Sequence, residues 1–398
     1  MRLTDYLSSN HSLLVSVIIP VYNGNKTLCS CLDSLMQLNF PKEDREIIVV
    51  DNHSTDNTKE IISQYPVKYV FEPKRGRGKA RNAGIRASLG KYIAFTDADC
   101  VVDKLWLKNL IKGFTSDTVA GCGGEVSSCE PKTLIEKYYH YRNIYSQKNG
   151  LIKPRAILQR IATYNAIYRR QVLEEVGLFD SLFITNEDVD LSWRIFLKGY
   201  QLNYVPEAKV YHKYRDRLSD FFKQFFEYGY TRSYLLQKHK YSIKKPVVSF
   251  NDGISFFLIQ LKTIKSLFMT IFAKNNISEK GFFILDMVRE TALLLGRIYG
   301  LIGLRLGIVK IPTASFSLNN KLIWGIVNEK AVVSKPSSDF YYTLDEIGTK
   351  IWSLLLEAKK IPDIVDTIAN DFEADKEEIK AHLMDFIDEL KKEDLLKH

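Results

Sequence analysis

The sequence has few cysteines, glycines and prolines, and it has no long uncharged apolar run. Five cysteines in 398 residues cannot form a disulfide framework, and none has metal-type C-x-x-C spacing, so we expect reduced thiols and a cytoplasmic protein. The 21 glycines, 11 prolines and 12% aromatic residues exclude collagen-like, low-complexity and wholly disordered chains. No apolar stretch reaches the ~20 residues that span a bilayer, and residues 13–21 lack the position and cleavage pattern of a signal peptide.

The charge of the chain is distributed unevenly along it. The net charge of +9 divides into +5 for residues 1–200, +10 for residues 201–310 and −7 for residues 328–398. This change of sign predicts a domain boundary near residues 311–327. The length favours two or three domains, and 45% apolar residues are enough to fill their cores.

Short apolar runs alternate with helical stretches in the first 200 residues. This alternation predicts an α/β domain whose parallel sheet is covered by helices. Polar residues gather at the carboxyl ends of the strands, where open α/β sheets bind ligands. The expected strands are 13–20, 46–50, 67–71 and 92–96, and the expected helices are 27–38, 57–64 and 80–88.

Residues 201–310 form a mostly helical, aromatic-rich middle region. Within it, 253–273 and 281–309 are apolar but interrupted by charged residues. Such segments either pack as a helical subdomain or lie in a membrane interface, and the sequence leaves both alternatives open.

The C-terminal region combines short strands with three amphipathic helices. The first helix is expected to begin at Thr343, with Glu346 completing a capping box, and the third is expected to begin near Asp375. This content suits a winged-helix-like α+β unit. The expected strands are 315–318, 322–327 and 331–334.

Asp97 and Asp99 close an apolar run that ends at Phe95. Residues two apart in an extended chain point to the same side, so the two carboxylates can hold a divalent cation, Mg²⁺ or Mn²⁺. Such a cation leaves positions open to phosphate oxygens and neutralises a departing diphosphate. The alternative is a solvated turn after a strand.

Two further polar segments follow expected strands. Asp51 begins the run 51–58, where a carboxylate can accept hydrogen bonds from a base or a ribose, although several of these residues are also good helix caps. Residues 75–82 are basic and glycine-rich. Arg77 and Lys79 can meet phosphate there, and glycines permit a close backbone approach; the alternative is a flexible solvated loop.

Glu187 and Asp188 precede an apolar helical stretch, and His212 lies near the end of the expected α/β region. A carboxylate at a helix start can act as a general base toward an acceptor hydroxyl or thiol, but it can equally cap the helix and complement its dipole. His212 can bind a metal or touch a diphosphate, and its alternative is a structural role.

Taken together, these segments resemble the family-2 glycosyltransferases with a GT-A (Rossmann-like) fold, over roughly residues 13–240. The motifs that carry the resemblance are Pro20–Gly24, Asp51–Thr58, Gly78–Gly90, Phe95–Asp99, Asn165, Gly177–Asp180, Glu187-Asp188 and Trp193-Arg194.

The resemblance implies an inverting, metal-dependent transfer from a nucleotide-sugar donor, and it favours a UDP-sugar. Processive synthases of this family carry Gln-x-x-Arg-Trp after the base, whereas this chain has Gln-Phe-Phe-Glu-Tyr at 224–228, so we expect a single transfer. The implied residues are Pro20, Tyr22, Asn23 and Asp51 for the nucleoside, Arg77 and Lys79 for the phosphates, Asp99, Asp97 and His212 for the metal, and Asp188 as the base with Glu187 beside it.

The C-terminal part, about residues 316–398, resembles the PqqD-like peptide-recognition domains. The resemblance lies in Tyr342–Trp352, Ile364–Ile368 and Phe386–Leu396. It implies that the leader of a ribosomally made precursor peptide binds as an added edge strand. The alternative is a winged helix for nucleic acid, and the charge of −7 argues against it because phosphate contacts need lysine and arginine.

We therefore expect a GT-A domain at 1–240, a basic amphipathic helical segment at 241–312 and a PqqD-like peptide-binding domain at 313–398. The expected protein transfers a sugar to a peptide held by its own C-terminal domain and binds no nucleic acid. One alternative is a peripheral enzyme at the inner face of the membrane that modifies a lipid-linked or cell-envelope glycan, suggested by the +10 of the middle region. Another alternative is a non-catalytic peptide-binding scaffold. The presence of Asp97, Asp99 and Asp188 argues against it.

Overall fold

The computed structural model describes residues 14–152, 159–239 and 277–305, and several segments after residue 316. The chain divides into two compact units, Met1–Arg305 and Leu306–His398. The helix expected at 253–273 and most of the boundary region 311–327 lie outside the described residues, and the division at residues 240 and 312 stays a prediction. The described C-terminal segments are 317–318, 323–327, 330–334, 341–357, 359, 361–372, 375–392 and 396–397.

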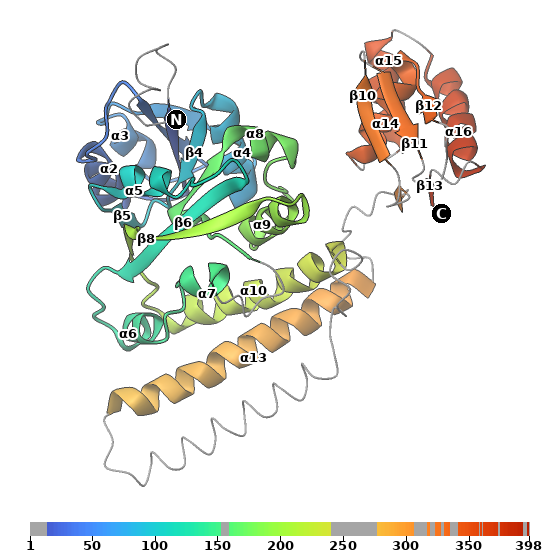
Figure 1. Cartoon of the computed structure of the whole chain (residues 1–398). Coiled ribbons are helices and arrows are strands. Elements are labelled where there is room, and N and C mark those ends of the chain that lie inside the picture. Colours follow the sequence, from blue (N-terminus) through green and yellow to red (C-terminus); the bar gives the residue numbers. More distant parts are fainter. Residues whose placement is uncertain are drawn as a thin grey trace. The chain divides into compact units, whose positions relative to one another are not determined.

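One eight-stranded sheet forms the centre of the first unit, in the order β3-β2-β1-β4-β7-β6-β8-β5 (Figure 1). Its first four strands are parallel and agree with the expected strands to within two residues, which confirms the α/β fold class. Their bounds are β1 (Val15–Val21), β2 (Arg45–Asp51), β3 (Lys68–Phe71) and β4 (Tyr92–Phe95).

The other half of the sheet is mixed rather than parallel. β7 is antiparallel to β4 and β6, β6 is parallel to β8, and β5 is antiparallel to β8. β6 was not expected because it contains glycines, which disfavour strands. They are needed here, since a Cβ on Gly121 would press on the Tyr168 ring and one on Gly124 would overlap the Ala208 carbonyl. The bounds are β5 (Cys100–Val102), β6 (Val119–Ser128), β7 (Ala166–Arg169) and β8 (Gln201–His212).

Helices cover both faces of the sheet because the side chains of β1 alternate between them. Val17 and Ile19 lie in one buried core with α2 and α5, whereas Ile18 lies in the other core with α4, α8 and α9. The helices are α2 (Leu28–Met36), α3 (Thr58–Ile62), α4 (Arg77–Ala87), α5 (Trp106–Lys112), α8 (Arg170–Glu175) and α9 (Glu187–Leu197).

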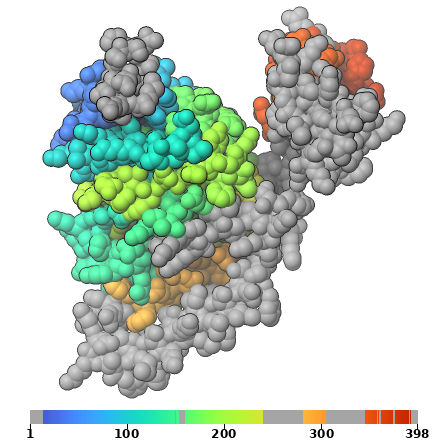
Figure 2. All heavy atoms as spheres, in the orientation of Figure 1, coloured from blue at the N-terminus to red at the C-terminus, as the bar shows by residue number. Residues whose placement is uncertain are grey.

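Two long helices, α10 (Leu218–Lys238) and α13 (Ile277–Arg305), lie side by side below the sheet in Figure 1. Their backbones approach closely: a Cβ on Gly229 would overlap the Leu293 carbonyl, and one on Gly296 would overlap the Phe226 carbonyl. The helix α6 (Leu134–Tyr141) contacts α13, and their residues adjoin in the space-filling view (Figure 2). None of the helices in the described part of the chain is long and apolar enough to cross a bilayer.

The described segments of the second unit form a three-stranded antiparallel sheet and three helices. Its first helix begins at Glu346 rather than at Thr343, because Asp345 is the N-cap and accepts a hydrogen bond from Gly348 N at 2.7 Å. Asp375 caps the third helix, as expected. The elements are β10 (Ile323–Val327), β11 (Lys330–Ser334), β12 (Tyr341–Thr343), α14 (Glu346–Leu356), α15 (Ile361–Asp371) and α16 (Lys376–Lys392), with β9 (Ser317–Leu318) paired to β13 (Leu396–Lys397).

Candidate active site

Asp51 ends β2 at the edge of the sheet where β1 and β4 also end. Its carboxylate is buried, and it accepts hydrogen bonds from Ser54 N at 2.9 Å and from the Tyr69 hydroxyl at 3.2 Å. Part of its acceptor capacity is therefore used inside the protein.

Asn23 joins the loop after β1 to the loop after β2. Its backbone is left-handed (φ 52°), its N–H donates to Ser54 Oγ at 3.0 Å, and its side-chain oxygen accepts from Thr55 N at 2.8 Å. The polar residues of 51–58 thus fix the two loops to each other. Pro20 is partly buried in β1, and the ring of Tyr22 is 44% exposed beneath the Arg75 guanidinium.

The glycine-rich basic segment is mostly helical, contrary to the loop expected there. α4 begins at Arg77, so both Arg77 and Lys79 lie in its first turn. Gly78 and Gly84 allow close packing of α4: a Cβ on Gly84 would overlap the Ile18 side chain, and one on Gly78 would press on the Asp180 carbonyl. Desolvation by the surrounding protein lowers the pKa of the Arg77 guanidinium, but the charges of Glu187 and Asp97 raise it more. The net shift of this pKa is upward, so the side chain stays cationic.

Asp97 and Asp99 do not continue β4, and the expectation of an extended chain is wrong here. The backbone turns at Ala98, and Cys100 N donates to the Asp97 carbonyl at 3.0 Å. The two carboxylates therefore face different partners. Asp97 Oδ1 accepts from Arg81 Nη2 at 3.0 Å, whereas Asp99 Oδ1 lies 3.6 Å from His212 Nε2.

His212 stands beside Asp99 because β5 and β8 pair with Cys100 opposite His212. Its Nδ1 lies 2.9 Å from the Lys213 carbonyl oxygen, so Nδ1 donates a hydrogen bond there and Nε2 is the ring nitrogen that faces Asp99. The ring is buried and stacks on Tyr145, with centroids 4.8 Å apart.

The donor set at Asp99 and His212 fits a divalent cation such as Mn²⁺ or Mg²⁺. Asp99 Oδ1 and His212 Nε2, which lie 3.6 Å apart, could both contact one such ion. The Cys100 sulfur also lies in this group of atoms, all within 4.8 Å of one another. Burial and the nearby acids raise the pKa of the Cys100 thiol well above its usual range, so it stays protonated and is a poor ligand for a hard cation.

Glu187 and Asp188 occupy the first turn of α9. Glu187 is buried and accepts from Arg81 Nη1 at 2.5 Å. Burial, and then the charge of Glu187, raise the pKa of the Asp188 carboxyl to about 6, although Arg81 and Arg160 oppose the shift. A carboxyl that titrates near neutrality and is partly exposed can accept a proton from a substrate.

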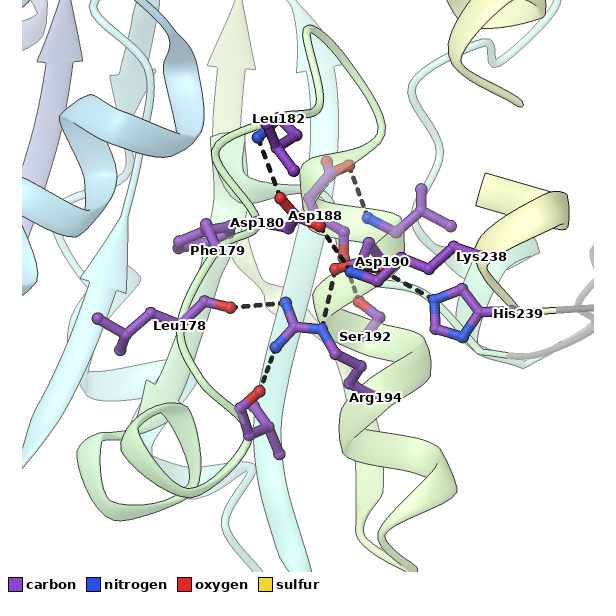
Figure 3. A network of polar contacts seen from close by, with 12 residues as sticks. Leu178, Phe179, Asp180, Leu182, Asp188, Asp190, Ser192, Arg194, Lys238 and His239 are labelled. Atoms are coloured by element: carbon purple, nitrogen blue, oxygen red, sulfur yellow. Dashed lines mark hydrogen bonds and ion pairs between the residues drawn. The ribbon is translucent and has the colours of Figure 1, made fainter. Parts of the chain in front are cut away.

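A polar network centred on Asp190 holds α9 in place (Figure 3). The buried Asp190 carboxylate accepts from Arg194 Nε at 2.9 Å, from His239 Nε2 at 2.8 Å and from Lys238 Nζ at 2.9 Å. Arg194 also donates to the Leu178 carbonyl at 2.6 Å. Burial would raise the pKa of Asp190, but the hydrogen bond from His239 and the charges of Arg194 and Lys238 lower it below its usual range. The network joins the start of α9, the loop before it and the end of α10.

Gln224 on α10 makes hydrogen bonds to three tyrosines, one of which stacks on His212. Its side-chain oxygen accepts from the Tyr139 hydroxyl at 2.6 Å, and its amide donates to the hydroxyls of Tyr145 at 2.7 Å and Tyr228 at 2.8 Å. Because Tyr145 stacks on His212, Gln224 fixes the orientation of that ring from a different element.

Two residues of the candidate site were missed by the sequence reasoning, Arg81 and Tyr145. Arg81 had a usable signal: it lies three residues after Gly78 and four before Ile85, on the buried face of α4, where an isolated charge needs a partner. Tyr145 had none, since it lies in a segment without clear periodicity.

Comparisons with known proteins identify the family of the first unit. The model of "Glycosyl transferase family 2" matches residues 16–177. A glycosyltransferase of Haloferax volcanii, AglE, is 33% identical over 209 residues, which cover 50% of this chain and 67% of that protein. This chain belongs to glycosyl transferase family 2.

A second family model, "Coenzyme PQQ synthesis protein D (PqqD)", matches residues 330–396 of this family-2 glycosyltransferase. The pre-mycofactocin glycosyltransferase of Mycobacterium tuberculosis is 27% identical over 256 residues, which cover 63% of this chain. The chain spans 53%, about half, of the length of that relative.

The fold also matches a solved GT-A structure. The mannosyltransferase PcManGT of Pyrobaculum calidifontis, solved with GDP-Man and Mn²⁺, superposes with a TM-score of 0.50 at 17% sequence identity. The match covers 75% of this chain and 92% of that one. At this identity the likeness shows the fold alone.

Proposed function

We propose that the chain is an inverting, metal-dependent, non-processive glycosyltransferase that moves a sugar from a UDP-sugar to a peptide held by its C-terminal domain. The observation that carries the proposal is the Arg81 guanidinium, which contacts Asp97 at 3.0 Å and Glu187 at 2.5 Å. The acids after β4 and the carboxylates that begin α9 are thereby held in one site, as a single in-line displacement requires.

The donor side of the proposed site uses the carboxyl ends of the strands. Asp51, Pro20, Tyr22 and Asn23 take the nucleoside, while Arg77 and Lys79 in the first turn of α4 approach the diphosphate. Asp99 and His212, with Asp97 as a further acid, hold the cation; when bound, that cation neutralises the charge of the departing diphosphate. The fold neighbour PcManGT was solved with Mn²⁺ and a nucleotide sugar, which supports this assignment.

Asp188 is the proposed general base. Its raised pKa allows it to take a proton from the acceptor hydroxyl or thiol near neutral pH, while Glu187 beside it remains paired with Arg81. The acceptor approaches past α10, where Tyr228 and Glu227 stand in place of the Arg-Trp of processive synthases. This difference supports a single transfer.

A peptide acceptor is supported by the fusion with the PqqD-like unit and by the name of the pre-mycofactocin relative. A domain that holds the precursor raises the effective concentration of the segment to be modified. The acidic charge of residues 328–398 favours peptide over nucleic acid as its ligand.

The test is to incubate the full chain with Mn²⁺, a panel of UDP-sugars and the peptide encoded by a neighbouring small open reading frame. A mass increase of one hexose or a related unit is the expected result, and Asp188→Asn should abolish it while UDP binding persists. A peptide mass that stays unchanged with every donor would contradict the proposal.

A second candidate is a peripheral enzyme that glycosylates a lipid-linked or envelope glycan. It is favoured by the exposed apolar side chains Ile284, Leu295 and Ile302, which helical spacing places on one face of α13. Flotation with anionic liposomes separates the candidates: a chain that stays entirely out of the lipid fraction counts against this one.

A further inference from the structure

We propose that Arg81 is a positioning residue that fixes the general base relative to the donor-binding acids through one guanidinium. The inference rests on the proposed function and deepens it. Arg81 lies on α4, and its two terminal nitrogens divide between Asp97, after β4, and Glu187, at the start of α9. Glu187 is 106 residues from Arg81 in sequence, and one rigid planar group spans the gap.

Stability alone is a poor explanation for this arrangement. Arg81 is 2% exposed and Glu187 is 3% exposed, and a buried ion pair is often no more stabilising than apolar residues of the same volume. Within the described residues, Arg81 Nε is buried without a hydrogen-bond partner. The guanidinium is therefore held mainly through Nη1 and Nη2, which contact the two carboxylates. The Arg81 guanidinium therefore connects the segment after β4 to the start of α9.

The same cation sets the electrostatic environment of Asp188. The carboxyl of Asp188 interacts electrostatically with Glu187 on its own helix and with Arg81 on α4. The positive charge of Arg81 favours the ionised form of Asp188. The other titratable groups that face it are Arg160 before the 3-10 turn η1 (Thr163–Asn165), Tyr164 in that turn, Tyr168 on β7 and Tyr228 on α10. Removing the charge of Arg81 therefore makes Asp188 harder to ionise.

Two substitutions separate the roles of charge and shape. Arg81→Lys keeps the positive charge but offers no planar fork to reach both carboxylates, whereas Arg81→Met removes the charge at similar length. Arg86→Met is the matched control, because Arg86 lies on the same helix and its side chain is exposed. All four full-length proteins are compared for kcat against pH with the UDP-sugar that turns over best, for UDP–Mn²⁺ binding by calorimetry, and for thermal unfolding.

We expect kcat to fall about 100-fold in both Arg81 variants, the size of effect caused by a misplacement of about 1 Å, while UDP–Mn²⁺ still binds. The acid limb of the pH profile should stay in place for Arg81→Lys and move upward by about one pH unit for Arg81→Met. The Arg86→Met control should match the natural chain.

Several results overturn the inference. One is an Arg81→Met variant with the natural kcat and an unmoved acid limb. Another is a loss of activity that only follows the loss of folded protein, with the acid limb of Arg81→Met unmoved. Failure of the natural chain to turn over any UDP-sugar is a separate outcome and contradicts the proposed function instead. In that case the unfolding midpoint still tests the Arg81 link, since Arg81→Met leaves Glu187 and Asp97 without their buried cation and should unfold at a lower temperature than Arg86→Met.

Discussion

The Nε2 atom of His212 lies 3.6 Å from Oδ1 of Asp99, although 112 intervening residues separate the two in the sequence. The antiparallel pairing of β5 with β8 makes them neighbours. The hydrogen bond from Nδ1 to the Lys213 carbonyl and the stacked Tyr145 ring fix which imidazole nitrogen faces the carboxylate. In the proposed metal site, these partners would hold the His212 ring in position for a cation, as supporting groups around metal sites do.

His212→Ala is expected to weaken Mn²⁺ binding in the presence of UDP by at least about 10-fold, since even groups that only support a ligand change metal affinity by that factor. Titration of the full chain with Mn²⁺, followed by calorimetry, measures the change. His140→Ala is the control because His140 is exposed and lies on α6. Unaltered Mn²⁺ affinity in His212→Ala would remove His212 from the site.

The pH dependence of transfer should report Asp188. Because burial and Glu187 raise the pKa of this carboxyl to about 6, the base form is lost as the pH falls through 6, and kcat should fall with it. Asp188→Asn should lose transfer at all pH values. Asp117→Asn, at a fully exposed carboxylate, is the control and should keep the profile of the natural chain.

The same shift predicts a cost in stability at neutral pH. A carboxyl whose pKa is higher in the folded chain than in the unfolded chain stabilises the fold below the unfolded pKa of about 4, and that contribution is lost as the pH rises through about 6. Asp188→Asn should therefore unfold at the same temperature as the natural chain, or at a higher one, at pH 8. A clear drop in the midpoint would mean that Asp188 is a structural residue.

Much of the fold could be predicted from the sequence because β1, β2 and β4 are apolar runs that end in polar residues. The positions of Asp51 and Asp97 at the carboxyl ends of β2 and β4 were predictable for the same reason. Local pattern also predicted the caps of the C-terminal helices in part: Asp375 is an expected cap, whereas the sequence favours a capping box that begins two residues before Asp345, at Thr343.

The other features of the fold and the site depend on tertiary contacts, which local sequence patterns do not indicate. The turn at Ala98 sends Asp97 toward α4 and Asp99 toward β8, and the period of an extended chain gives the opposite expectation. β6 is a strand because Gly121 and Gly124 leave room for neighbouring strands, so tertiary packing overrides a poor strand propensity. The pairing of Arg81 with Glu187 likewise exists only once α4 and α9 are packed.

Asp190→Asn should destabilise the first unit by about 3–5 kcal/mol at pH 7, because it leaves the cations of Arg194 and Lys238 without their buried partner. The pKa of Asp190 is lower in the folded chain, so its stabilisation is present above the unfolded pKa of about 4 and is lost as the pH falls toward the folded value. Denaturant unfolding at pH 7 and in acid should show the difference between the two chains shrinking.

Glu174→Gln is the matched control for that experiment. Glu174 is 58% exposed and pairs with Arg170 at 3.6 Å within one helix, a surface pair worth about 0.3–0.5 kcal/mol. An Asp190→Asn chain that loses no more stability than this control would show that the network in Figure 3 is not what holds α9.

Gly296→Ala should destabilise the contact between α10 and α13, although alanine is the better helix former by about 1 kcal/mol. The added Cβ would overlap the Phe226 carbonyl, and backbone cannot give way as a side chain can, so a net loss of about 1–3 kcal/mol is expected. Gly281→Ala on the same helix is the control, because its Cβ meets only the flexible side chain of Leu134. Since α10 carries Gln224 and Tyr228, Gly296→Ala should also raise KM for the acceptor while UDP binding stays unchanged. Equal stability of the two variants would show that α10 and α13 do not meet at Gly296.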